Sequence, residues 1–265
     1  MSKNIRLYWA GGRRSMINFG DSLSPLLVSL LAGKAVEYAD PHQCDIVAIG
    51  SILDKVIAKR WKRKISFRSE PIVVWGTGSF SADSLLKSYK FNIKAVRGPL
   101  TRMAMDLDTQ TPIGDPGLLI DRIDVKAPKK YKWGIIPHNV DHSVPIIKDM
   151  QNNTMNSNII DLRNPNLPET IKQIKQCEFI ISSSLHGIIS ADALGIPNIW
   201  MSPSTNVIGA NWKFNDYFTS VGRTISDPVP LQNNLKNLEP MAILSDQKII
   251  EQRKLDLEIS FKNIF

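Results

Sequence analysis

The sequence predicts an α/β fold of two Rossmann-like domains that face each other across a cleft. Short runs rich in Ile and Val alternate along the chain with amphipathic stretches of helical length, and a charged segment divides the chain into halves of similar size. The apolar runs lack strict alternation, which is typical of strands buried on both faces of a parallel sheet. Strands that alternate with helices in this way indicate α/β units.

Two series of strands and the helices between them follow from this pattern. The strands are expected at residues 5–9, 45–49, 72–75 and 93–96, and then at residues 133–136, 158–161, 179–182 and 198–200. The helices are expected at residues 21–31, 99–105, 144–151, 167–176 and 187–194. Pro99 suits a first helical position, where its missing amide proton costs nothing.

The segment DRIDVKAPKKYK, residues 121–132, is charged and contains a proline, so it is the expected linker. The predicted domains are residues 1–122 and 132–245. Residues 246–265 contain an amphipathic helix with Asp246 as its expected N-cap. This helix is expected to pack back across the domain boundary.

The composition is that of an ordinary globular protein, with 265 residues, 43% hydrophobic and 22% charged. Cys44 and Cys177 are the two cysteines, which excludes a disulfide framework and fits a reducing cytosol. No apolar run approaches the length that crosses a bilayer, and the first residues lack the pattern of a secretory signal. A cytoplasmic protein is therefore expected.

The net charge of +8 predicts an anionic partner. Half of the fourteen residues between Lys55 and Arg68 are Lys or Arg. They form either a solvated helix face or a peripheral contact with the anionic inner face of the cell membrane, where each basic side chain adds about 1 kcal/mol. Nucleic-acid binding is not expected, because the signature of a nucleic-acid module is missing.

The candidate site residues follow the predicted strands, because ligands of parallel sheets bind at the carboxyl ends of the strands. Asn18 and Asp21 come after the first strand; Asp21 either caps a helix or faces the cleft as a carboxylate that accepts a proton from a hydroxyl. Gly76, Thr77 and Gly78 follow another strand, where glycine lets a ligand approach the backbone.

Arg97 and Gly98 lie where a strand becomes a helix, and Arg102 follows one turn later. An arginine in this position can bind a carboxylate or a phosphate through two parallel hydrogen bonds. The alternative for Arg97 is a structural ion pair, with Asp115 as its candidate partner.

In the second half an apolar strand runs into Ser183, Ser184, His186 and Gly187. This order points hydroxyls, amide protons and an imidazole at the cleft; a serine hydrolase is not favoured, because the GxSxG elbow is missing. His138 is expected to line the cleft from the far side. No metal is predicted, because His142 is a poor second ligand to His138 and no cluster of acidic residues occurs.

Seven segments in order along the chain resemble the landmarks of the polysaccharide pyruvyl transferases: NFGDSLSP, AIGSIL, WGTGSF, AVRGPLTR, GDPGLL, SSSLHG and KFNDYF. The resemblance runs over residues 18–218. It implies a GT-B-like pair of domains that transfers a pyruvyl group from phosphoenolpyruvate, without a further cofactor, to two hydroxyls of one hexose as a cyclic ketal. The hexose would belong to a capsule or exopolysaccharide repeat unit, which is often lipid-linked. His186, Arg97 and Lys213 would hold the donor.

The residues agree with this chemistry, because phosphoenolpyruvate is highly anionic and Arg97, Arg102 and Lys213 are cationic. His186 is the candidate general acid and Asp21 the candidate base, in roles that can be exchanged. The closest rival is a GT-B glycosyltransferase that uses a nucleotide sugar. A non-catalytic binder of anionic polysaccharide or lipid is the alternative from another class, and it predicts no phosphate release.

Overall fold

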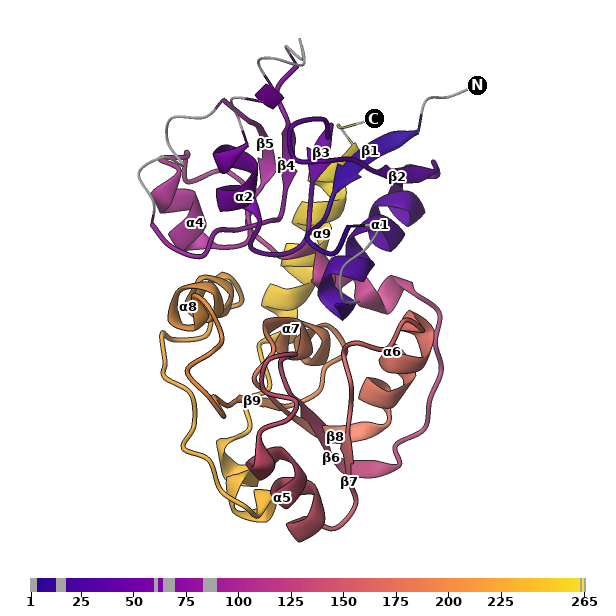
Figure 1. Cartoon of the computed structure of the whole chain (residues 1–265), viewed down its shortest axis with the longest axis vertical. Helices are drawn as coiled ribbons and strands as arrows, with labels where there is room; N and C mark the ends of the chain where they lie inside the picture. The colour runs from indigo at the N-terminus through magenta and orange to yellow at the C-terminus, as the bar shows by residue number, and fades with distance from the viewer. Residues whose placement is uncertain are drawn as a thin grey trace.

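The computed structural model describes residues 4–12, 18–59, 62–63, 70–82, 90–262 and 264. Over these residues the chain forms one parallel sheet in each half, with helices packed around both sheets (Figure 1). The strand orders are β2-β1-β3-β4-β5 and β7-β6-β8-β9, and all the paired neighbours run parallel. The predicted fold class is confirmed.

The first half contains three elements that the sequence pattern did not predict, β2, α2 and the 3₁₀ helix η2. Its elements are β1 (Ile5–Tyr8), α1 (Phe19–Ala32), β2 (Val36–Tyr38), β3 (Ile46–Val47), α2 (Leu53–Ala58), β4 (Val73–Trp75), β5 (Asn92–Ala95), α4 (Pro99–Ala104) and the 3₁₀ helix η2 (Pro116–Arg122). The edge strand β2 was missed because it is short and not fully buried. The helix α2 was missed because its six residues are too few to show a helical period.

The second half matches the predicted strands closely but adds the helix α8 and the 3₁₀ helix η3. Its elements are β6 (Tyr131–Ile136), α5 (Pro145–Asn153), β7 (Ser157–Ile159), α6 (Leu167–Lys175), β8 (Cys177–Ser182), α7 (Leu185–Ala193), β9 (Asn198–Trp200), α8 (Ala210–Ser220) and the 3₁₀ helix η3 (Leu235–Met241). The helix α8 was not predicted, because its aromatic, Asn and Thr residues have modest helix propensity. It begins after Gly209, whose φ of 62° is the left-handed conformation.

Both sheets reverse their strand order at the same place. In each half the first strand lies between the second and the third, so the chain moves outward in one direction and then in the other. The reversals lie between β1 and β3 and between β6 and β8. Ligands of open α/β sheets bind outside the carboxyl ends of the strands at such points.

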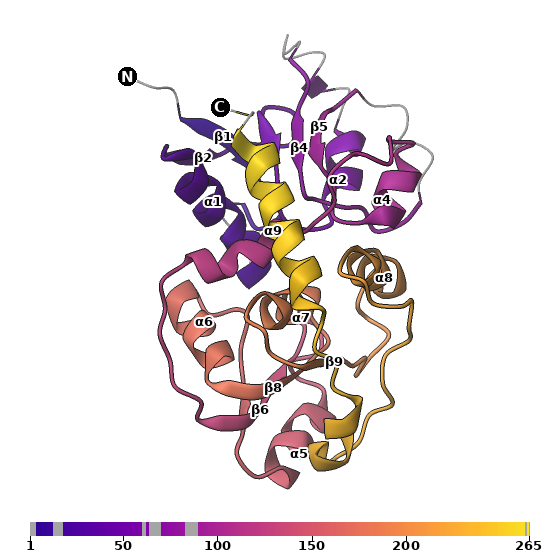
Figure 2. The same cartoon turned by 180° about the vertical axis from the view of Figure 1, so that it is seen from behind.

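The last helix, α9 (Gln247–Lys262), returns from the second half to the sheet of the first half (Figure 2). Asp246 precedes it and accepts a hydrogen bond from the amide of Lys248 at 2.8 Å. Trp75, in β4, donates its Nε1–H to the carbonyl of Leu257 at 3.1 Å, and its ring lies 4.6 Å from that of Phe261.

The largest apolar core is shared by the two halves. It joins buried residues of β1, α1 and β4 to residues of α6, α7, α8 and α9, with the leucines of η2 between them. Burial of apolar surface is the main favourable contribution to folding. The halves therefore share one core, and the described part of the chain holds them against each other along η2, α7 and α9.

Candidate functional site

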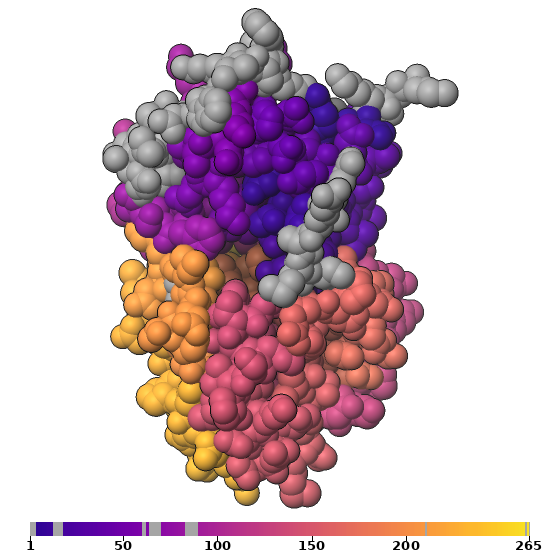
Figure 3. All heavy atoms as spheres, viewed as in Figure 1, coloured from indigo at the N-terminus to yellow at the C-terminus, as the bar shows by residue number. Residues whose placement is uncertain are grey.

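A cavity of about 180 Å³ lies between the two halves, along the seam that is hollowed in the space-filling view (Figure 3). Its walls include the residues that follow the four strands at the two reversals: Ala10 after β1, Gly50 and Ser51 after β3, His138 after β6, and Ser184, Leu185 and His186 after β8. The start of α1 adds Asn18 and Asp21, the start of α8 adds Lys213, and the wall is completed by Ile52, Lys55 and Phe80.

The start of α1 decides between the two predicted roles of Asp21. Asn18 is the N-cap of this helix, since its Oδ1 accepts a hydrogen bond from the amide of Gly20 at 3.1 Å. Asp21 is therefore not the cap but a first-turn residue that lines the cavity. Burial raises the pKa of Asp21 to about 6, against the opposing effect of the Lys55 charge. At neutral pH this carboxyl group is mostly ionised but keeps a minor protonated fraction.

The turn after β8 places His186 against the first turn of α1. A β-carbon on Gly20 would lie 2.1 Å from Nδ1 of the imidazole, so the ring fits only because residue 20 is glycine. The Nε2 atom of His186 is buried and has no hydrogen-bond partner among the described residues. Burial lowers the pKa of His186 to about 3, and the charges of Lys213 and Arg97 act in the same direction. The imidazole is therefore neutral near pH 7.

The serines of this turn hold the backbone in shape. Ser182 accepts a hydrogen bond from the amide of Ser184 at 3.0 Å, and a β-carbon on Gly187 would lie 2.3 Å from its Oγ. Ser183 accepts a hydrogen bond from the amide of His138 at 2.9 Å and does not line the cavity. Ser184 does line it. Of the predicted cluster, Ser184 and His186 face the cavity, while Ser183 and Gly187 support them.

Lys213 and His138 form the wall opposite α1. Burial lowers the pKa of Lys213 to about 8, and the charge of Arg97 adds to that effect. Burial and the charge of Lys213 also lower the pKa of His138, whose Nδ1 accepts a hydrogen bond from the amide of Val140 at 3.3 Å. Lys213 thus brings a partly desolvated positive charge to the cavity, as a site for an anion requires.

Arg97 is not on the cavity wall, and this corrects the prediction that it contacts the donor directly. Its side chain has no exposed surface. Its Nε donates to Asp216 at 2.9 Å, its Nη2 to the carbonyl of Ser79 at 2.9 Å, and its Nη1 to Oγ of Ser51 at 2.5 Å. The ion-pair partner is therefore Asp216 rather than Asp115. Arg97 reaches the cavity through the hydroxyl of Ser51.

Gly98, Arg102 and Asp115 also lie away from the cavity wall. A β-carbon on Gly98 would lie 1.9 Å from the carbonyl oxygen of Asp216, so this glycine permits α8 to approach α4. Arg102 donates to the carbonyls of Thr109 and Thr111, at 2.5 and 3.4 Å. Asp115 accepts from the amide of Gly117 at 2.9 Å and caps η2, and burial raises its pKa to about 6. Arg102 is therefore not placed to bind the donor.

The segment after β4 supports the wall from behind. Gly76 has a φ of 79° and packs on Pro116, and Thr77 donates its hydroxyl to the carbonyl of Gly50 at 2.6 Å. A β-carbon on Gly78 would lie 2.5 Å from Cζ of Arg97. These three predicted cleft residues shape the turn that presents Ser51 and leave room for the Arg97 guanidinium.

Ser51 and Lys55 are cavity residues that were not among the predicted site residues. Ser51 follows β3, and its Oγ accepts from Arg97 but donates to no described residue. Lys55 was considered only as part of the basic cluster, yet it lines the cavity and its charge acts on Asp21. The strand-end position of Ser51 in AIGSIL was the signal that could have identified it.

Of the seven basic residues between Lys55 and Arg68, Arg60, Lys64 and Arg68 lie outside the described residues. Within the described part, Arg63 is buried and donates to the carbonyls of Cys44 at 2.9 Å and Glu70 at 2.5 Å. Arg63 is therefore not available for the predicted membrane contact, which depends on the other basic residues of the cluster. That contact stays a prediction.

The described residues contain neither a cluster of metal ligands nor a helix that could cross a membrane. Among them no three His, Cys, Asp or Glu side chains are arranged to hold a metal ion. His142 lies beside Asp161, with Nε2 and Oδ2 3.3 Å apart, rather than beside His138. Of the described helices, none combines the length and the apolar character needed to cross a membrane.

Comparisons with known proteins connect this geometry to a family. Residues 3–205 match the family model described as polysaccharide pyruvyl transferase. The chain is 29% identical over 213 residues to the succinoglycan biosynthesis protein ExoV of Rhizobium meliloti, a match that covers 78% of this chain and 62% of ExoV. It is 33% identical over 161 residues to the uncharacterized protein L143 of Acanthamoeba polyphaga mimivirus, covering 57% of this chain and 55% of L143.

The matches thus span between about a half and two thirds of the length of these two relatives. Among solved structures, the spinosyn rhamnosyltransferase SpnG is similar at 11% identity over 92% of this chain and 76% of that chain, with a TM-score of 0.33, which is too low to carry an argument. The family model ends before Lys213 but includes Asp21, Ser51 and His186. Because it covers most of the sequence, the chain belongs to the polysaccharide pyruvyl transferase family.

Proposed function

We propose that this chain transfers the pyruvyl group of phosphoenolpyruvate to two hydroxyls of one hexose in an exopolysaccharide repeat unit, closing a cyclic ketal and releasing phosphate. Family membership supports the transferred group, and the name of ExoV supports a role in exopolysaccharide biosynthesis. The observation that carries the choice of donor is the cavity itself. It is small, it lies at both strand reversals, and Lys55 and Lys213 bring positive charge to it.

The donor would be held by charge and by oriented hydroxyls. Lys213 and Lys55 would face its phosphate and carboxylate. The hydroxyl of Ser51 would donate to one of these anionic groups, because its oxygen is already occupied by Arg97. A hydrogen bond to a charged group contributes about 1.5–3 kcal/mol. Arg97 would thus act through Ser51 as a positioning residue rather than as a direct ligand.

The reaction needs one proton donor and one proton acceptor. Protonation of the methylene carbon gives the neighbouring carbon oxocarbenium character, and a sugar hydroxyl attacks that carbon as its own proton is removed. The bond to phosphate then breaks, and the second hydroxyl adds to the same carbon and gives its proton to the departing phosphate. In total, the reaction consumes one phosphoenolpyruvate and two hydroxyl groups of the sugar, and it forms one cyclic ketal and one phosphate.

Of the two assignments, we favour Asp21 as the acid and His186 as the base. The pKa of Asp21 is raised to about 6, so this group keeps a protonated fraction near neutral pH. The lowered pKa of His186 keeps the imidazole unprotonated, and the negative charge of a bound donor would raise this pKa and so make the imidazole a stronger base for the hydroxyl proton. A bound anion favours protonation of Asp21 further, since a neutral carboxyl group does not repel it. Each proton transfer of this kind is worth about 10²–10⁴ in rate.

The test is incubation of the chain with phosphoenolpyruvate and a panel of synthetic hexosides, with product masses and phosphate release measured. The expected product gains a pyruvyl unit with loss of one water. The variant His186→Ala should lose transfer by about 10²-fold or more while keeping its unfolding midpoint, and His42→Ala, outside the cavity, is the matched control. Turnover with a nucleotide sugar and none with phosphoenolpyruvate would instead establish the glycosyltransferase alternative.

A further inference from the structure

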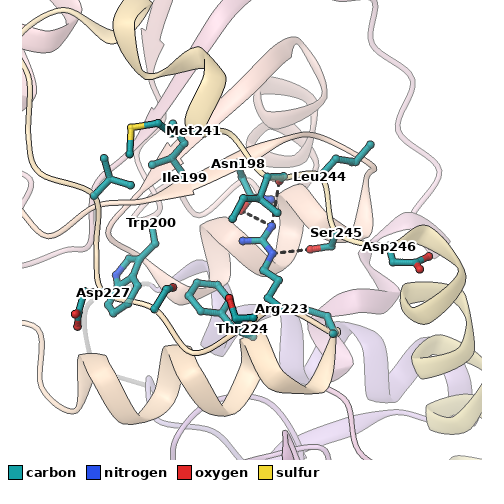
Figure 4. Close-up of a pocket in the computed structure, with 16 residues that line it drawn as sticks. Asn198, Ile199, Trp200, Arg223, Thr224, Asp227, Met241, Leu244, Ser245 and Asp246 are labelled. Atoms are coloured by element: carbon teal, nitrogen blue, oxygen red, sulfur yellow. Dashed lines mark hydrogen bonds between the residues drawn. The ribbon is translucent and has the colours of Figure 1, made fainter.

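A second and larger cavity, of about 470 Å³, lies in the second half along the free edge of β9 (Figure 4). Trp200 and Ile199 of β9 form one wall, and the segment from Met241 to Asp246 forms another. The end of α8 and the residues that follow it, including Arg223 and Thr224, close the third side. None of the residues of the transfer cavity lines it.

Arg223 is a buried cation that is only partly satisfied by protein groups. Its side chain is 7% exposed and stands over the Phe218 ring. Its Nη2 donates to Asp192 at 2.7 Å and to Asn198 at 2.9 Å, and its Nε donates to Ser245 at 2.7 Å. Its Nη1 has no partner among the described residues. Nη1 is not among the buried unpaired atoms of the described residues, so its N–H groups keep solvent contact and are open to a ligand in the cavity.

The edge of β9 supplies a second unused donor. Along this edge Asn198 exchanges both of its backbone hydrogen bonds with Ile243, and the carbonyl of Trp200 accepts from the amide of Val229. The amide of Trp200 points to the same side, because its neighbours on both sides along the strand bond to β8. In the described part of the chain it has no acceptor. Trp200 and Arg223 both line the cavity, and each carries an N–H donor without an acceptor among the described residues.

The charges around the cavity exclude an anionic ligand. The positive charge of Arg223 is offset by the buried carboxylate of Asp192, 2.7 Å away. Asp227 and Asp246 add two exposed carboxylates at the rim. A phosphate or a nucleotide would meet a net negative surface, whereas a neutral molecule rich in hydroxyls would find donors and acceptors together.

The shape excludes an added peptide strand. Such a strand would need a run of open backbone groups along β9, but Ile243 and Val229 already occupy the positions on either side of the Trp200 amide. What remains is a pocket with apolar side chains, Met241 and Leu244 among them, beside a few polar groups. This combination of apolar surface and convergent hydrogen-bonding groups is typical of a small-molecule or sugar site.

We infer that this cavity is a second carbohydrate site, which holds one neutral sugar unit of a glycan away from the reacting hexose. The inference deepens the proposed function and rests on it in so far as the acceptor is a glycan. The helix α8 joins the two cavities: Lys213 borders the first and Phe218 the second. At 1.5 Å per residue these positions are about 8 Å apart along the helix.

The inference is tested by binding to the full chain without phosphoenolpyruvate. The probes are cellotetraose, mannotetraose and galactotetraose as neutral glycans and tetragalacturonate as an anionic one, observed by saturation-transfer NMR. At least one neutral tetrasaccharide is expected to bind and tetragalacturonate is not. Thr224→Trp fills the cavity and should weaken binding about tenfold or more, whereas Ile225→Trp, the adjacent exposed residue that does not line it, should leave binding unchanged.

Arg223→Lys keeps the charge beside Asp192 but removes the free Nη1 donor, so it should also weaken binding; its unfolding midpoint is measured beside it, because the variant also loses hydrogen bonds of the guanidinium to Asn198 and Ser245. The inference is overturned if no neutral tetrasaccharide binds, if tetragalacturonate binds more tightly, or if Thr224→Trp and Ile225→Trp have the same effect. If the chain transfers pyruvyl groups to a monosaccharide glycoside but binds none of these probes, the second-site inference is wrong and the proposed function stands. If it binds a probe but transfers no pyruvyl group, the proposed function is wrong and the second site stands.

Discussion

Asp216, on α8 of the second half, receives the Nε–H of Arg97 at 2.9 Å, and neither side chain has any exposed surface. The same carboxylate accepts from the amide and the hydroxyl of Thr101, at 2.9 and 2.7 Å. One buried carboxylate thus ties the start of α4 to the helix that carries Lys213. The arginine that the sequence suggested as a ligand of the donor instead fixes the two walls of the cavity relative to each other.

Arg97→Ala is therefore expected to destabilise the fold, and not only to lose activity as the variant of a direct donor ligand would. Removing one partner of a buried pair leaves an uncompensated charge, which costs about 3–5 kcal/mol. Urea unfolding measures this cost. The double variant Arg97→Ala/Asp216→Ala should lose less than the sum of the two single variants. Additive losses would show that the two side chains do not act as a pair.

Ser51→Ala tests whether the hydroxyl of Ser51 contacts the donor. Loss of a hydrogen bond to a charged group costs about 1.5–3 kcal/mol, which corresponds to a rise of roughly ten- to a hundredfold in KM for phosphoenolpyruvate. The control is Ser79→Ala, which removes a buried hydroxyl near Arg97 but keeps the carbonyl that binds Nη2. Equal KM values for Ser51→Ala and the unmodified chain would contradict the assignment.

Gly20→Ala tests the contact between α1 and His186. Alanine favours a helix over glycine by about 1 kcal/mol, but its β-carbon would overlap the imidazole. The ring must move, and a displacement of about 1 Å can cost about 10²-fold in rate. The expected result is lost transfer in a folded protein, measured by phosphate release beside circular dichroism. Ser22→Ala in the same helix is the control, and full activity of Gly20→Ala would place His186 outside the reaction.

The pH dependence of kcat/KM tests the roles of Asp21 and Lys213. Activity should fall as pH rises through about 6, where Asp21 loses its proton, and fall more steeply above about 8, where Lys213 loses its charge. His186 does not titrate in this range, because its pKa is lowered to about 3. The residual activity of Asp21→Asn should lack the first step, and comparison with this variant cancels the titration of the donor itself. A first step retained in Asp21→Asn would assign it to another group.

Much of the fold could be predicted from the sequence, because its signals are local. The runs of Ile and Val predicted eight of the nine strands that the structure describes, and the strand β9 has the predicted bounds. What local patterns missed was short or of mixed propensity: β2 on a sheet edge, the two turns of α2, and the aromatic helix α8. These elements are stabilised by tertiary packing rather than by their own period.

The sequence by itself determined the fold class, the family and the strand ends that carry Asp21, Ser184, His138 and His186. Which of the polar residues at those ends face the cavity was decided only by the tertiary structure. The sequence places Arg97 at a strand end but does not show that its guanidinium pairs with Asp216, far along the chain. Nor does it show that Ser51, which accepts a hydrogen bond from Arg97, lines the cavity instead. The physical reason is that burial and pairing are set by neighbours distant in sequence, and these neighbours decide whether a charged group binds a ligand or another residue.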